Sequence, residues 1–307
     1  MTSMSKRPEL PAPAEDKGDW LENVLAMPVG RGWCEVAGAR IELLSWGERG
    51  APGILFAHGF AANADWWRAI AGPLSQGYRV AALSFSGMGQ SGWRESYDLD
   101  TFADELDAAA REAGLDDGPV APLLVAHSFG GFPAVVSATS RPDRWRGLVL
   151  IDSRVHTSLS QMPGPSERVE PRVVSDRGKL VARFRLMPQQ PCRTPRLLAE
   201  AAEYSVRKLT LDSGEEGWSW ASDPNLFPDI RSRGIPELLP QIACPVAYVH
   251  GEESYIVRDG MLEGIRANLP AGSPVVAIPD AGHHVILDQP VAVTGVLRLL
   301  DTMWSAG

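Results

Sequence analysis

The strongest constraint on the fold is an alternation, along most of the chain, of short apolar segments with longer amphipathic ones. Short apolar runs bounded by turn residues predict buried strands, and the longer segments have the periodicity of helices. The predicted strands are 53–58, 78–85, 122–127, 147–152, 244–251 and 273–280. The predicted helices between them are 64–74, 99–114, 130–141, 258–268 and 290–304. This alternation favours a parallel sheet covered by helices on both faces.

Two segments depart from the alternation. Residues 32–36 and 40–46 flank a short Ala-Gly-Ala segment and predict a β-hairpin ahead of the first buried strand. Residues 153–240 are rich in Pro, Arg and Trp and show no clear strands. We expect this second segment to form a mostly helical cap inserted into the sheet domain.

The predicted fold is therefore α/β, with a mostly parallel, eight-stranded sheet flanked by helices. Residues 29–152 and 241–307 are expected to form this core, and residues 153–240 its cap or lid. Residues 1–28 begin with a polar, Pro-rich stretch and are interpreted as an N-terminal extension.

Composition narrows the possible partners and the compartment. The formal net charge of −9 disfavours nucleic acid or an anionic membrane as the main partner, because either would require a basic surface. The three cysteines, Cys34, Cys192 and Cys244, lack metal-ligand spacing, and an odd number argues against a disulfide framework. The first 20 residues have no apolar core, and no stretch approaches the ~20 apolar residues of a membrane span. We expect a cytoplasmic protein that acts on a small molecule, in an oligomeric state that the sequence leaves open.

The segment 122–131, PLLVAHSFGG, places a serine between a predicted strand and a predicted helix. Small residues at Ala126 and Gly130 permit a sharp turn that lifts Ser128 above the carboxyl edge of the sheet, where ligands of parallel sheets bind. This pattern is the small-x-Ser-x-small form of a nucleophile elbow. The alternative interpretation is a helix N-cap serine that follows a buried strand.

A serine nucleophile needs a base, and the segment 278–290, IPDAGHHVILDQP, supplies two histidines at the same predicted edge. Serine precedes histidine in the chain, as in hydrolases with this elbow. We assign His283, which directly follows a glycine, as the base. His284 is expected to point into packing or towards the cap.

Four stretches in order make the chain resemble the α/β-hydrolase fold superfamily: FAHGF (56–60), SFSGMGQS (84–91), AHSFGG (126–131) and DAGHHVILDQP (280–290). The resemblance covers about residues 30–152 and 240–305. It implies a serine-nucleophile member with a cap, similar to esterases and lactonases.

The resemblance also implies how an oxyanion would be bound. The amide groups of Phe60 and Phe129 match the positions of the family's two donors. His58, in the same loop as Phe60, is structural in the family and receives no catalytic role. In the glycine turn at 84–91, Ser84 stands where relatives often carry Asp, and Ser86 where they carry a larger polar residue.

The carboxylate of the triad is the least certain part of the resemblance. The family often places an Asp where this chain has Ser254, and a serine cannot carry the charge. Asp152, at the end of a predicted strand beside that of Ser128, is our first assignment. Glu253 is the alternative acid, and Glu252 or no acid at all stays open.

The expected activity is cleavage of an acyl bond by a serine hydrolase, in an ester or lactone of a small apolar or aromatic molecule. The chemistry implies no metal and no organic cofactor. Alternatives are a C–C bond hydrolase or perhydrolase of the same fold, or a non-catalytic ligand-binding member. Candidate substrate-binding residues are Trp66, Trp67, Trp218, Trp220 and His284, at least half of which are expected to serve only as hydrophobic core.

Overall fold

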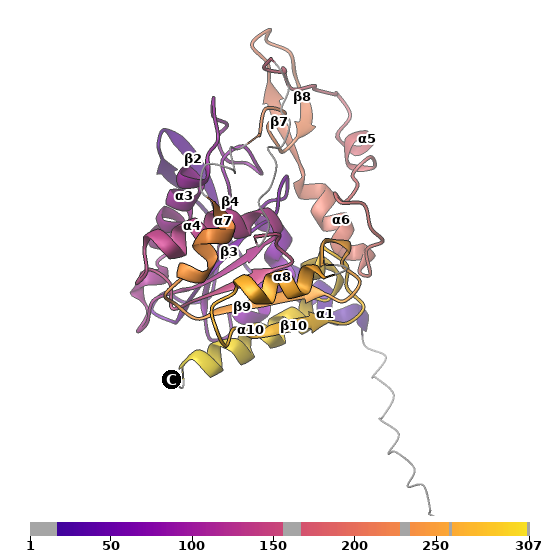
Figure 1. Ribbon diagram of the computed structural model, residues 1–307. Helices are drawn as coiled ribbons and strands as arrows, with labels where there is room; N and C mark the ends of the chain where they lie inside the picture. The colour runs from indigo at the N-terminus through magenta and orange to yellow at the C-terminus, as the bar shows by residue number, and fades with distance from the viewer. Residues whose placement is uncertain (1–16, 156–166, 228–233, 258–259, 306–307) are drawn as a thin grey trace, which may run out of the picture.

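An eight-stranded sheet lies at the centre of the computed structural model (Figure 1), which describes residues 17–155, 167–227, 234–257 and 260–305. The strand order is β1-β2-β4-β3-β5-β6-β9-β10. The strands are β1 Gly30–Val36, β2 Ala39–Trp46, β3 Gly53–Ala57, β4 Arg79–Ser84, β5 Leu123–His127, β6 Gly147–Ile151, β9 Val246–Gly251 and β10 Val275–Ile278.

The sheet is mostly parallel, as predicted. Strand β2 runs antiparallel to both of its neighbours, β1 and β4, and the pairs from β4 to β10 are parallel. The predicted hairpin is present, and its turn has positive φ angles at Ala37 (44°) and Gly38 (78°). Two successive positive φ angles are the geometry that two-residue hairpin loops require.

Helices cover both faces of the sheet, because its strands are apolar on both sides. In β3, Leu55 belongs to one buried cluster and Phe56 to the other. The first face packs against α3 Leu99–Glu112, α4 Gly131–Ser140, α7 Ile235–Leu238 and α8 Met261–Asn268. The second packs against α1 Lys17–Leu25, α2 Arg68–Leu74, α9 Val285–Asp288 and α10 Pro290–Ser305. Short 3₁₀ turns complete the core: η1 Ala64–Trp67, η2 Leu115–Asp117, η3 Ser128–Gly130, η4 Leu239–Gln241 and η5 Tyr255–Val257.

The expectation of a cap without clear strands is wrong for residues 167–227. This segment contains α5 Arg177–Val181 and α6 Pro195–Tyr204, but also an antiparallel pair, β7 Val206–Thr210 and β8 Glu216–Trp220. Figure 1 shows the four elements together at one end of the molecule. In β7 only Val206 is buried, and in β8 the buried residues alternate with less buried ones. Several of the other residues are charged, so neither strand has the continuous apolar run that marks the core strands.

The inserted segment 167–227 is tied to the sheet domain by polar contacts. Asn63 donates to the carbonyl of Tyr204 (2.9 Å), and the Tyr97 hydroxyl donates to Asp223 (2.6 Å). These bonds place the segment over the carboxyl edge of the sheet, where the loops after β3 and β4 end. Across the described ranges, none of the helices combines the length and apolarity that crossing a membrane demands.

Candidate active site

Three side chains from separate strand ends form one hydrogen-bonded row. Ser128 follows β5, Asp152 follows β6, and His283 lies in the loop after β10. The Ser128 hydroxyl lies 2.9 Å from His283 Nε2, and His283 Nδ1 lies 2.8 Å from Asp152 Oδ1. His283 and Asp152 are 2% and 0% exposed. A proton on Nδ1 donated to Asp152 leaves Nε2 as the acceptor for the hydroxyl.

Ser128 has a strained backbone, with a φ of 52° at the junction of strand and helix. Non-glycine residues hold such an angle only where their surroundings enforce it, as at the elbow of a nucleophile. A Cβ on Gly130 would lie 2.7 Å from the carbonyl oxygen of His58, so the turn needs a glycine there. Ser153, which the sequence analysis did not single out, donates from its hydroxyl to the carbonyl of Ser128 (2.6 Å).

Asp152 has three hydrogen-bond donors around its buried carboxylate. Besides His283, the hydroxyl of Ser254 donates to Oδ1 (2.7 Å) and the amide of Gly251 to Oδ2 (3.0 Å). These donors compensate the carboxylate for its loss of water. Ser254, the residue that departs from the family pattern, thus lies against the carboxylate that the sequence analysis assigned in its place.

The alternative acid, Glu253, lies elsewhere. Its carboxylate pairs with Arg193 at 2.6 Å, and both side chains are about half exposed. Among the described residues the carboxylate bonded to His283 is that of Asp152, not that of Glu253. The structure therefore brings the first-choice residues together and places the alternative on the surface.

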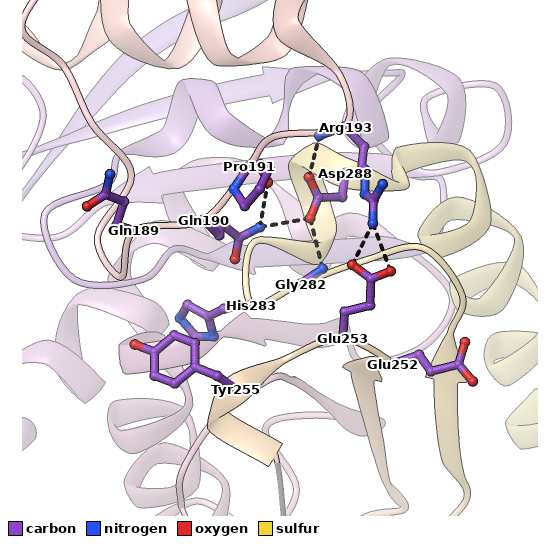
Figure 2. A pocket seen from close by; sticks show the side chains of 10 residues that line it. All are labelled: Gln189, Gln190, Pro191, Arg193, Glu252, Glu253, Tyr255, Gly282, His283 and Asp288. Atoms are coloured by element: carbon purple, nitrogen blue, oxygen red, sulfur yellow. Dashed lines mark hydrogen bonds and ion pairs between the residues drawn. The ribbon is translucent and has the colours of Figure 1, made fainter.

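The backbone on both sides of His283 is held by a polar network that includes the cap segment (Figure 2). The amide of Gly282 donates to Asp288 (2.9 Å). The amide of His284 donates to the side-chain oxygen of Gln190 (3.1 Å). Gln190 in turn donates to Asp288 (2.8 Å), whose other oxygen accepts from the amide of Arg193 (2.9 Å). Gln190 comes from the inserted segment 167–227, so a contact between this segment and the sheet domain holds the loop of His283.

The loop after β3 approaches Ser128 closely. A Cβ on Gly59 would lie 3.1 Å from the Cβ of Ser128. Neither the amide of Phe60 nor that of Phe129 has a hydrogen-bond partner among the described residues, and their rings meet at 5.8 Å. The two amides that the resemblance predicts as oxyanion donors therefore have no competing partner in the described part of the chain.

His58 and Glu42 hold this loop from below. His58 Nδ1 donates to the carbonyl of Gly59 (2.7 Å), and its Nε2 accepts from the amide of Phe85 (3.0 Å). Burial lowers the pKa of His58 from 6.5 to about 4, which keeps the imidazole neutral. Ser84, noted for its departure from Asp, donates to Glu42 (2.8 Å), so a carboxylate from the neighbouring strand β2 occupies the region.

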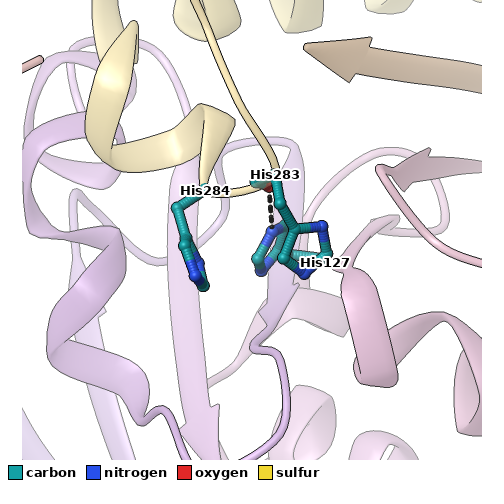
Figure 3. A group of neighbouring side chains, drawn as sticks. All are labelled: His127, His283 and His284. Atoms are coloured by element: carbon teal, nitrogen blue, oxygen red, sulfur yellow. Dashed lines mark hydrogen bonds between the residues drawn. The ribbon is translucent and has the colours of Figure 1, made fainter. Parts of the chain in front are cut away.

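Three buried imidazoles cluster at the site, that of His283 in the row and those of His127 and His284 next to it (Figure 3). His127 Nε2 donates to the carbonyl of His283 (2.9 Å). Burial, followed by the neighbouring imidazole of His283, lowers the pKa of His284 to about 3, and the same causes lower that of His127. Ring nitrogens of all three lie within 4.8 Å of one another, but both nitrogens of His283 already bond Ser128 and Asp152. A metal ion could be held there only by breaking that row.

Two hollows border the loops of this site. The first, about 530 Å³, is lined by His283 and by the polar side chains drawn in Figure 2, with Tyr255. The second, about 270 Å³, is lined by the start of the loop after β3 and by aromatic side chains, including Trp66 and Trp220.

The remaining substrate-binding candidates do not line either hollow. Trp67 is wrong as a candidate: it is fully buried and stacks on Phe56 at 4.4 Å, because adjacent residues of the η1 turn point in different directions. Trp218 packs instead against the guanidinium of Arg177. His284 is buried against Trp66, with ring centroids 5.6 Å apart, so it supports the wall of the second hollow from behind.

Known proteins are similar to this chain over most of its length. The Alpha/beta hydrolase family matches residues 54–296. An esterase of Mycobacterium tuberculosis is 28% identical over 281 residues, which cover 87% of this chain and 88% of the esterase. A lipase of the same organism is 28% identical over 263 residues, covering 82% and 94%. Among solved structures, the thioesterase domain from the curacin biosynthetic pathway has a similar fold, with a TM-score of 0.71 and 24% identity over 88% of this chain and 99% of the domain.

Proposed function

Since this chain belongs to the alpha/beta hydrolase family, we propose that it is a serine hydrolase that cleaves a carboxylic ester or lactone through an acyl-enzyme. The observation that carries the proposal is the continuous hydrogen-bonded row from Ser128 through His283 to Asp152. The relatives named as an esterase and a lipase support ester cleavage as the class of reaction.

In the first half of the reaction, the hydroxyl of Ser128 attacks the acyl carbon while His283 Nε2 takes its proton. Asp152 holds the imidazole in the required tautomer and stabilises the cation that forms. The cation then protonates the leaving oxygen, and the bond between the acyl carbon and that oxygen breaks. Water, deprotonated by the same imidazole, subsequently attacks the acyl-enzyme and releases the acid.

The amides of Phe60 and Phe129 are the proposed donors to the negative oxygen that develops in both halves. Preorganised amide donors act strongly here because they are already oriented before the charge appears. The short helical turn that begins at Ser128 adds its N-terminal end to this field.

A non-catalytic, ligand-binding role was suggested by the serine at position 254. The bond between Asp152 and His283 argues against that role, because it supplies the carboxylate that Ser254 lacks. We therefore rank hydrolysis above ligand binding.

A fluorophosphonate probe tests the proposal directly. We expect covalent labelling of Ser128 and hydrolysis of 4-nitrophenyl acetate, both lost in Ser128→Ala and both retained in Ser213→Ala, which changes an exposed serine. Labelling that persists in Ser128→Ala, or a protein that neither reacts nor turns over, contradicts the proposal. A lactone and a vinylogous diketone tested beside the ester separate the hydrolase subclasses.

A further inference from the structure

The smaller hollow beside the proposed oxyanion site has aromatic walls. Phe184 lies between Trp66 and Trp220, with ring centroids 6.3 and 6.4 Å away. Phe60 and Ala61, from the loop that carries a proposed oxyanion donor, line the same hollow. Aromatic side chains around a space of about 270 Å³ suit an apolar or aromatic group of modest length.

Two guanidinium groups, those of Arg183 and Arg185, line this hollow, and no carboxylate does. Both side chains are exposed, and neither has a carboxylate partner among the described residues. Arg185 donates only to backbone carbonyls of its own loop, those of Ala182 (3.1 Å) and Phe184 (2.6 Å). In a protein with a net charge of −9, this is a local excess of positive charge.

Three other arginines of the same segment have carboxylate partners. Arg177 pairs with Glu203, Arg193 with Glu253, and Arg196 with Glu22 and Glu200. The larger hollow, which His283 lines, has carboxylates beside its one arginine. Of the two hollows, the aromatic one is therefore the one lined by arginines without carboxylates.

The direction of the proposed reaction decides which part of the substrate meets this charge. His283 must protonate the leaving oxygen, so the leaving group departs on the side that His283 lines. The acyl group stays bonded to Ser128. Of the two hollows, the aromatic one borders the loop of the proposed oxyanion donor, at Phe60 and Ala61.

We propose, on the basis of the proposed hydrolase function, that the acyl group has an apolar or aromatic body and ends in a carboxylate that Arg183 and Arg185 bind. The substrate class is then a half-ester of a dicarboxylic acid. Water and the half-ester give the free dicarboxylic acid and the alcohol, with the water oxygen entering the acyl carbon. Guanidinium groups bind carboxylates through paired N–H donors, which gives both affinity and orientation.

The test compares two esters of equal carbon number, the mono-4-nitrophenyl ester of adipic acid and 4-nitrophenyl hexanoate, after subtraction of spontaneous hydrolysis. We expect Arg183→Gln to lower the ratio of kcat/KM for the anionic ester to kcat/KM for the neutral ester between about threefold and tenfold, mainly through KM of the anionic ester. Arg183→Lys should restore part of the loss, and added salt should weaken the effect. The matched control is Arg172→Gln, since Arg172 is exposed on the same segment, has no carboxylate partner among the described residues and does not line the hollow.

Binding without turnover separates this inference from the proposed function. In Ser128→Ala, adipic acid monoamide should quench tryptophan fluorescence more strongly than hexanamide, and Arg183→Gln should abolish the difference. Equal values of kcat/KM for the two esters, or an anion preference that survives in the double variant Arg183→Gln/Arg185→Gln, overturns the inference while leaving the hydrolase intact. If the unchanged protein turns over neither ester but Ser128→Ala still binds the monoamide selectively, the proposed hydrolase function is overturned. The inferred class of ligand, an apolar group that ends in a carboxylate, is then retained.

Discussion

The two sides of Ser128 are built by different interactions. On the side of His283, directed hydrogen bonds from Asp288 and Gln190 hold the loop, and the adjoining hollow is polar. On the side of Phe60, aromatic packing forms the wall, and the charges there belong to two arginines without carboxylate partners in the described chain. The difference indicates that the orientation of His283, the proposed base, depends on hydrogen bonds, which are directional, whereas the proposed acyl site depends on packing, which tolerates a range of shapes.

The largest effect is expected from breaking the hydrogen-bonded row of Ser128, His283 and Asp152. Asp152→Asn should lower kcat by ~10³-fold or more, because the amide favours the wrong tautomer of His283. Glu253→Gln should change kcat less than about twofold, since its partner is a surface arginine and not the imidazole. Steady-state kinetics with 4-nitrophenyl acetate measure both. If Glu253→Gln lowers kcat more than Asp152→Asn does, Glu253 and not Asp152 is the carboxylate that supports His283.

On the aromatic side, adjacent tryptophans should behave differently. Trp67→Ala should lower the free energy of unfolding by about 3–5 kcal/mol, because it empties a fully buried site stacked on Phe56. Trp66→Ala should cost less stability and should instead raise KM, because Trp66 borders the hollow. Urea unfolding and kinetics of the purified variants provide the two readouts. Equal losses of stability with unchanged KM would show that both residues are only core.

The loop on the aromatic side should also make stability depend on pH. The folded protein keeps the pKa of His58 near 4, so below about pH 6.5 the unfolded chain binds more protons. The stabilisation is complete above that pH and is lost as the pH falls towards 4. A displacement from 6.5 to about 4 corresponds to about 3 kcal/mol.

His58→Gln should therefore flatten the decline of the unfolding free energy between pH 7 and pH 4.5, measured by urea titration at several pH values. Burial also lowers the pKa values of His127 and His284, so part of the slope should remain. A slope identical to that of the unchanged protein would mean that His58 does not contribute.

The smallest effect is expected from breaking the contact between Gln190, in the inserted segment, and the backbone next to His283. Gln190→Ala removes the acceptor for the amide of His284 and should lower kcat about tenfold with little change in KM, because it loosens the base and not the acyl site. Its neighbour Gln189 lines the same hollow, is exposed and has no hydrogen-bond partner among the described residues, so Gln189→Ala is the matched control. Equal effects of the two variants, or a change confined to KM, would count against positioning by the cap.

Local patterns in the sequence were sufficient for the sheet, the hairpin and the choice of Ser128 and His283 as candidates. A buried strand, a turn of small residues and a helix are contiguous in the chain, so the elbow at Ser128 is visible without knowledge of distant contacts. The two cap strands escaped prediction because half of each is polar, and pairing with each other stabilises them more than their own composition does.

By itself, the sequence determined the layered core and the strand ends that carry chemistry, because the periodicity of burial is encoded in neighbouring residues. Only the tertiary structure showed which of the two carboxylates, that of Asp152 or that of Glu253, reaches the imidazole of His283. Asp152 precedes His283 in the chain by more than a hundred residues and Glu253 by thirty, so neither contact can be read from neighbouring residues. The tertiary structure likewise decided that Gln190 holds the loop of His283 and that Trp66 rather than Trp67 lines a hollow. Such contacts join segments far apart in sequence, or depend on the direction of one side chain, and neither leaves a local pattern.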